Sequence, residues 1–198
     1  MEDISVTDSP AAYKALEVCA SGYYRQYANR PAGQVEGVEE ARRLFHAIGI
    51  DPTRRRPSSE ALLRRALKNK SLYSVNTLVD TGNWCSLDFL LPVCVYDADK
   101  IEGTVRFGLG SENDAYEALN GSFLQLKGRY CLADDLGAFG SPITDSRRSS
   151  VDFHTKHILY LVFAPETCSI EKMNHYIETS FQRIDKFCGG NIIGQGTI

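Results

Sequence analysis

Hydrophobic side chains recur at helical spacing in four stretches of this chain. Residues that return every three or four positions share one side of an α-helix and can pack against a core. The predicted helices run from Val38 to about Gly49, onward from a cap at Ser58 or Ser59, from about Val75 to Leu90, and from a cap at Ser169 to Gly189. The apolar stripe of the last helix, which we assign to the core and not to a cofactor site, comprises Ile170, Met173, Ile177, Phe181, Ile184 and Phe187.

One further stretch, residues 11–27, fits two patterns. Leu16, Val18 and Ala20 alternate as in a strand, whereas Ala12, Leu16, Cys19, Tyr23 and Tyr27 follow helical spacing. Alternation over several residues is typical of a half-buried strand. We predict a strand from Ala15 to Tyr24.

Short apolar runs between turn residues predict the remaining strands. They cover Val93–Tyr96, Thr104–Phe107, Phe123–Leu126, Tyr130–Ala133 and Ile158–Ala164. The last run carries no charge and is expected to be a central strand. Gly108–Asn120 is expected to be a loop with a turn of helix.

These elements together indicate an α+β fold. We expect mixed sheets, either one bent sheet or a sandwich-like pair, flanked by about four helices. The 198 residues suit a single domain with its core at about residues 38–188 and loose ends at 1–10 and 190–198.

The composition excludes several classes of site. Six cysteines show no close pair and no metal-ligand spacing, so we expect neither a metal nor a disulfide framework. No apolar stretch approaches the roughly 18 residues that a membrane span needs. We expect no cofactor, no contact with a membrane, and a cytoplasmic location.

Charge is unevenly distributed over the chain. Residues 36–70 hold nine Lys or Arg against five Asp or Glu, although the net charge of the whole chain is -3. Arg54, Arg55 and Arg56 precede a helix N-terminus, where the helix dipole favours acidic groups, so they are candidates for binding an anion. The alternatives are a solvated helical hairpin and an internal ion pair between Arg56 and Glu60.

Two groups of polar residues could form a site. Asn76, Asp80 and Asn83 are spaced by four and three, so a helix would align them on one face, directed at a strand end. The long segment 137–152 contains Asp145, Ser146 and Arg148, a possible pocket wall in which Asp145 would orient Arg148. A mobile surface loop is the alternative.

A second acidic pair, Asp134 and Asp135, follows the strand at Tyr130–Ala133. Paired acids at a strand end can bind a metal or act as acid and base. We favour a turn in which Asp134 accepts backbone hydrogen bonds.

The central segment VDTGNWCSLDFLLPVCVYDADKIEG supports a family assignment. It is followed by a strand with Arg106, then by LADDLGAFGSPITDSRRSS, and finally by Thr155 before ILYLVFA. This order resembles the editing and tRNA-binding module of the phenylalanyl-tRNA synthetase beta subunit and its small free-standing relatives. The resemblance covers roughly Ile50 to Pro165.

This resemblance implies a tRNA partner and a possible reaction. In the synthetase the module holds the aminoacyl end of tRNA and hydrolyses the wrong amino acid from it. Such hydrolysis needs a positioned water and donors for the oxyanion. The candidate orienting groups are Asn76, Asp80 and Asn83. The candidates for binding substrate or RNA are Arg54, Arg55, Arg56, Arg106, Asp145, Ser146 and Arg148.

The sequence also departs from the synthetase pattern. Cys94 stands where the module carries a histidine, and Leu161 falls at about the position of a glutamate that reads a substrate hydroxyl. The expected glycine-rich run becomes residues 139–142. We therefore predict that tyrosine is not the substrate. Two alternatives to tRNA binding with editing in trans are a small-molecule amino-acid binding or hydrolysing protein, and an interaction module without chemistry.

Overall fold

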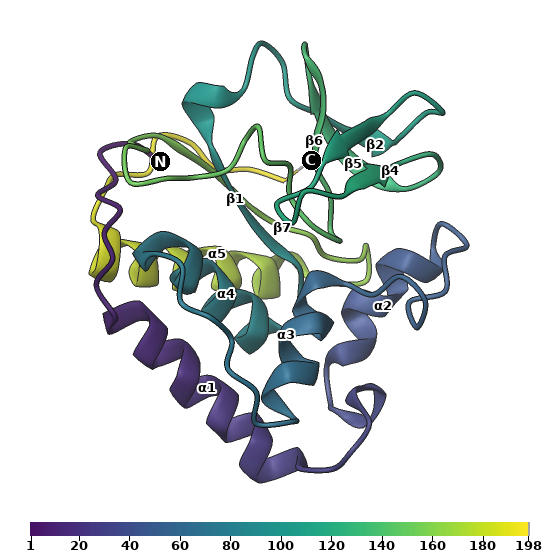
Figure 1. Ribbon diagram of the computed structural model, residues 1–198, viewed down its shortest axis with the longest axis vertical. Coiled ribbons are helices and arrows are strands. Elements are labelled where there is room, and N and C mark those ends of the chain that lie inside the picture. The colour runs from purple at the N-terminus through teal and green to yellow at the C-terminus, as the bar shows by residue number, and fades with distance from the viewer. Residues whose placement is uncertain (198) are drawn as a thin grey trace.

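The computed structural model describes residues 1–197 and places a layer of helices beneath several small sheets (Figure 1). The described residues form five α-helices, which are α1 (Ala11–Tyr27), α2 (Val38–His46), α3 (Ser58–Ala66), α4 (Thr77–Phe89) and α5 (Ile170–Cys188). None of these helices is both long and apolar enough to span a bilayer.

The strands form three small open sheets. They are β1 (Val93–Asp97), β2 (Arg106–Leu109), β3 (Ala115–Glu117), β4 (Phe123–Gln125), β5 (Tyr130–Asp134), β6 (Gly137–Gly140) and β7 (Ile158–Val162). Their orders are β1-β7, β2-β5-β6 and β3-β4, and every named strand pair is antiparallel. The predicted α+β class is confirmed, with open antiparallel sheets instead of mixed ones. The β7 strand pairs with β1 alone among the named strands and is not central.

Helix α4 is the element against which most of the other α-helices pack. It contacts α1, α3, α5 and β1. Thirteen residues long, it ends at Leu90, whose φ of 56° lies in the left-handed region, just before Pro92. The predicted helix, proline and strand of this segment are therefore confirmed.

The predicted strand at Ala15–Tyr24 is wrong, because this segment lies inside helix α1. Ala12 and Leu16 are fully buried, whereas Val18 is 69% exposed. A strand would have placed Leu16 and Val18 on the same face. Helical spacing instead turns Leu16, Cys19 and Tyr23 toward α4 and the core. This segment is therefore a fifth helix, in addition to the four that the sequence predicted.

Two other segments differ from expectation. Residues 108–120 contain β3, whose Tyr116 is buried, and no turn of helix. The N-terminal segment packs through Ile4 and Val6, and Glu2 exchanges two backbone hydrogen bonds with Asn191. Residues 192–197 are exposed. The expected loose end also included Ile198, which lies outside the described residues.

Candidate functional site

Asn76 and Asp80 both accept hydrogen bonds within the chain at the start of α4. The Asn76 side chain accepts a hydrogen bond of 2.9 Å from the Val79 backbone N–H and caps the helix. Asp80 is fully buried and accepts hydrogen bonds from Ser74 Oγ (2.7 Å) and Val75 N (3.0 Å). Burial raises the pKa of Asp80, although both hydrogen bonds oppose the shift.

The capping arrangement gives two of the three candidates structural partners. Asn76 caps the first turn of α4, Asp80 accepts from Ser74 and Val75 in the segment before the helix, and Asn83 is half-buried further along the helix. Their catalytic role stays a prediction that this geometry does not favour.

The start of α3 also differs from the sequence-based picture. Pro57 is the N-cap and no serine caps the helix, because Ser59 Oγ donates to the Leu90 carbonyl oxygen instead. Glu60 is 2% exposed and binds Arg42 through two hydrogen bonds of 2.8 and 3.0 Å. The proposed Arg56–Glu60 pair is therefore wrong.

Arg148 and Arg106 both form ion pairs with carboxylates at the β5–β6 turn. Arg148 binds the two carboxylate oxygens of Asp134 at 2.9 and 3.0 Å, so the expected Asp145–Arg148 contact is wrong. Asp134 also accepts from the backbone N–H groups of Glu102 and Leu136, which confirms the turn interpretation. Arg106 binds Asp135 at 2.9 Å. Both arginines therefore have a carboxylate partner within the chain.

Asp145 belongs to a different group of polar side chains between β1 and the segment after β6. Its carboxylate accepts a 2.6 Å hydrogen bond from the hydroxyl of Tyr96, which is fully buried. Nearby, Cys94 Sγ donates to the Ser141 carbonyl oxygen at 3.6 Å. Burial raises the pKa of Asp145 to about 6, although hydrogen bonds from Tyr96 and Cys94 oppose the rise.

Most of this polar cluster is buried, although Asp145 is partly exposed. Cys94 and Ser141 are 3% and 0% exposed, and a Cβ at Gly140 would lie 2.0 Å from the Tyr96 hydroxyl. Leu161 is the direct partner of Cys94 in the β1–β7 register. The structure thus joins two positions that are 67 apart in sequence. Ser146, also buried, hydrogen-bonds to Ser149 at 2.8 Å instead of lining an open pocket.

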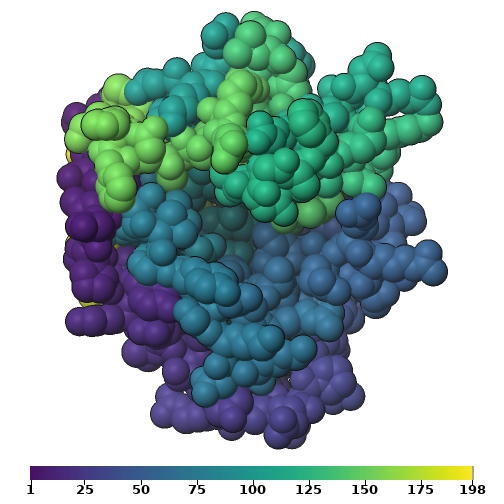
Figure 2. All heavy atoms as spheres, viewed as in Figure 1, coloured from purple at the N-terminus to yellow at the C-terminus, as the bar shows by residue number. Residues whose placement is uncertain are grey.

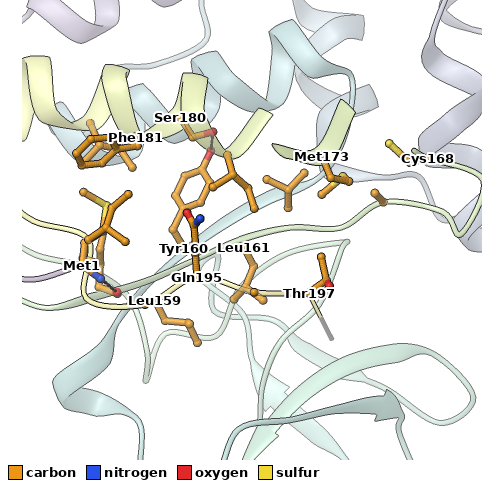
Figure 3. Close-up of a pocket in the computed structure, with 18 of the residues that line it drawn as sticks. Met1, Leu159, Tyr160, Leu161, Cys168, Met173, Ser180, Phe181, Gln195 and Thr197 are labelled. Carbon is orange, nitrogen blue, oxygen red and sulfur yellow. Dashed lines mark hydrogen bonds between the residues drawn. The ribbon is translucent and has the colours of Figure 1, made fainter. Parts of the chain in front are cut away.

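A cavity lies elsewhere, between β7, α5 and the C-terminal segment. It has a volume of about 360 Å³. Figure 3 shows Met173 and Phe181 of α5 on one side of the cavity, and Leu161 of β7 on the other side near Gln195 and Thr197. The predicted core stripe of α5 therefore lines a cavity in part, and Ile170 is 74% exposed.

The three consecutive arginines before α3 are exposed and almost unpaired. Arg54 approaches Asp51 at 3.7 Å with its side chain 88% exposed, and Arg56 reaches only the Thr53 carbonyl oxygen. Arg55 makes no ion pair with any described residue. Across from them lies Arg129, whose pKa is lowered by burial and by the charge of Arg55. We call Arg54, Arg55, Arg56 and Arg129 the arginine group.

This arginine group joins two parts of the chain. In Figure 2 the loop of residues 50–57 (blue) and the hairpins of residues 106–130 (green) project from the same side of the molecule. A small depression between them is lined by Ile50, Arg129, Tyr130 and Pro142, among others. Sequence reasoning found the three arginines of the loop and missed Arg129, because only tertiary contact brings it near them.

Among residues 1–197, no cluster of three or more His, Cys, Asp or Glu could hold a metal ion. Residues 40–186 match the model of the B3/4 domain. The chain belongs to the B3/4 domain family. This match takes in α3, α4, every named strand and most of α5.

Proteins similar to this B3/4 chain fall into two groups. It is 34% identical over 104 residues to the phenylalanine–tRNA ligase beta subunit of Bartonella henselae, covering 52% of the chain and 13% of that protein. It is 30% identical over 108 residues to the corresponding subunit of Neisseria meningitidis serogroup A. It is 26% identical over 172 residues to Bacillus subtilis YhzB, covering 86% of the chain and 75% of YhzB. The chain thus spans only about an eighth of the length of the first ligase subunits that it matches.

Proposed function

We propose that this B3/4 protein binds tRNA at its aminoacyl end. The observation that carries the proposal is the arginine group, whose cations have almost no carboxylate partners. Like charges held together without counter-charges favour a bound polyanion, and arginine forks match phosphate geometry. The similarity to tRNA ligase beta subunits makes tRNA the polyanion to test first.

Hydrolysis of mischarged aminoacyl-tRNA in trans is the finer part of this proposal. The Cys94–Leu161 pair stands at the positions where the synthetase module carries its histidine and glutamate, and Ser141 and Asp145 lie close by. Because Cys94, Tyr96 and Ser141 are buried, access of a substrate to Cys94 would need Tyr96 or the segment after β6 to move. Binding is therefore the part of the function that this geometry supports best.

The salt dependence of tRNA binding tests the binding proposal. Each phosphate contact with a single strand contributes about -0.7 to the slope of log K against log salt. We expect the Arg54→Ala/Arg55→Ala/Arg56→Ala variant to bind more weakly and with a slope shallower by about 2. Arg147→Ala is the matched control, since Arg147 is exposed and paired with Glu117 at 3.0 Å. Equal slopes for the triple variant and the wild-type protein would contradict the proposal.

Deacylation of a panel of correctly charged and mischarged tRNAs tests the hydrolytic part. Turnover of one mischarged species, lost in Asp145→Asn and Cys94→Ala but retained in Arg147→Ala, would establish editing in trans. Absence of turnover together with salt-sensitive binding would leave tRNA binding as the function.

A second candidate function is binding of a small molecule, which the α5 cavity favours. Ligand pockets are typically lined by apolar side chains with a few polar groups, and this cavity combines Met173, Phe181 and Leu161 with the hydroxyl of Ser180. A ligand there would raise the melting temperature without any dependence on the arginines. The third alternative is an interaction module that uses the α2–α3 pair. It predicts neither tRNA binding that depends on the arginines nor a melting temperature raised by a small molecule.

A further inference from the structure

We propose that the exposed face of the β2–β5 edge binds unpaired RNA nucleotides, with bases stacking on Phe107 and Tyr130 and phosphates held by the arginine group. This inference deepens the proposed function and depends on it. It names the part of the RNA that is recognised, a single strand, and the surface that recognises it.

The surface is a strip of apolar side chains on an edge strand. All four residues of β2 are exposed, and the strand pairs on one side only, with β5. Phe107 and Leu109 lie on one face because side chains alternate along a strand, and Leu109 is the direct partner of Tyr130. We call Phe107, Leu109 and Tyr130 the aromatic strip.

The aromatic strip presents a flat and anchored surface. The rings of Phe107 and Tyr130 stack with their centroids 5.3 Å apart and their planes at 22°. Phe107 also contacts Phe163, which is 6% exposed, at 5.8 Å between centroids. Phe107 nevertheless remains 40% exposed and Leu109 58% exposed. Edge strands are normally protected by charge or by burial, so a contiguous apolar strip here indicates a partner.

Charge next to the strip identifies that partner as a polyanion. Arg129 directly precedes Tyr130, and the two residues line the same depression, beside the loop that carries Arg55. No described carboxylate forms an ion pair with Arg55 or Arg129. Arg55 is exposed, and the Arg129 side chain donates only to the Gln125 carbonyl oxygen at 2.6 Å. Neither charge is neutralised by a described carboxylate, so both can bind the phosphates of a strand whose bases reach Phe107 and Tyr130.

Single-stranded RNA fits this combination better than a duplex. Stacking on an aromatic ring requires an accessible base face, and a duplex buries its base faces between neighbouring pairs. A protein strand added to the free edge of β2 would use the backbone of the edge but would leave the arginines unpaired.

The experiment compares two probes, a labelled single-stranded RNA dodecamer and the same strand in a duplex. We expect the wild-type protein to prefer the single strand and Phe107→Ala to lose about 5- to 100-fold of that affinity. Phe107→Trp should retain binding. Phe123→Ala is the matched control, because Phe123 is 81% exposed on β4, outside the aromatic strip. Leu109→Ala, which truncates an exposed side chain, provides a second test if Phe107→Ala folds poorly.

The outcomes separate this inference from the proposed function. Loss of binding in the arginine variant but not in Phe107→Ala or Leu109→Ala would retain tRNA binding and overturn the stacking surface. Equal losses for single strand and duplex would also overturn it. Failure of the wild-type protein to bind tRNA or the dodecamer at low salt would reject both proposals.

Discussion

At the scale of single residues, the polar side chains of this protein divide into those that satisfy the fold and those left for a ligand. Asn76, Asp80 and Asp134 are buried and use their oxygens on backbone or side-chain donors. Arg54 and Arg55 remain exposed with little or no pairing. A residue type in a suggestive pattern is therefore a weak guide to function until its partners are known.

Asn76→Ala should destabilise the protein because the first turn of α4 loses its cap. We expect the free energy of unfolding to fall by about 1 kcal/mol. Urea denaturation would measure it, with Asn83→Ala as a control that changes stability by less than about 0.5 kcal/mol. Unchanged stability in Asn76→Ala together with lost deacylation would favour the catalytic role instead.

Asp145 should make stability depend on pH in the mildly acidic range. Its pKa in the folded chain is about 6, above the ordinary value of about 3.9. Between these values the folded chain binds a proton that the unfolded chain has released, so the stabilisation is present below about pH 4 and is lost as the pH rises to 6. The wild-type protein should lose stability over this range relative to Asp145→Asn, as urea titrations at pH 4 to 7 would measure. A difference that does not vary with pH would refute this assignment.

At the scale of elements, ion pairs connect helices that share little apolar contact. Arg42 of α2 is the partner of the buried Glu60 of α3, and Lys172 of α5 binds Glu40 of α2 at 2.6 Å. These contacts hold α2 between the two other helices. The arginine loop of residues 54–56 lies in the segment that joins α2 to α3, so its position depends on how these helices are held.

Arg42→Ala should be costly because it leaves the Glu60 carboxylate buried and unpaired. Removing one partner of a buried pair typically costs about 3 to 5 kcal/mol, and we expect the lower figure. Arg43→Ala is the control, since Arg43 is exposed and reaches only Thr167. Chemical denaturation of both variants would measure the difference, and Glu60→Gln in the Arg42→Ala background should recover part of it. Equal stability of the two single variants would contradict the pairing.

At the scale of the whole molecule, the chain places its possible activities in different regions. The arginine group and aromatic strip lie where residues 50–57 face the hairpins, whereas the largely buried polar cluster lies between β1 and the segment after β6. The α5 cavity is bounded by β7 and α5. RNA binding, hydrolysis and small-molecule binding can therefore be tested by separate variants.

Tyrosine should not be released from mischarged tRNA by this protein. The position of the expected hydroxyl acceptor holds Leu161, an apolar side chain paired with Cys94 in the sheet. A site that hydrogen-bonds a substrate hydroxyl can discriminate by about 10⁴ to 10⁵, so its loss should change the substrate. Measured deacylation of tyrosyl-tRNA at a protein-dependent rate would contradict this prediction.

The sequence by itself determined the class of the fold, four of the five helices and the family. Helical spacing, Pro92 and short apolar runs are local signals, and they survive in the structure as α2 to α5 and most strands. The strand predicted within residues 11–27 was wrong because Leu16 fits both the alternating pattern with Val18 and the helical pattern with Ala12 and Cys19. Only packing against α4 decides which of them is buried.

Tertiary structure alone decided which charges are satisfied and which are free. Glu60 pairs with Arg42 and not with Arg56, and Arg148 pairs with Asp134 and not with Asp145. Long side chains pair with the groups that the fold brings within reach. The same contacts put Arg129 beside Arg55 and stacked Phe107 on Tyr130. Local patterns encode which elements form, but partners distant in sequence are set by the packing of those elements.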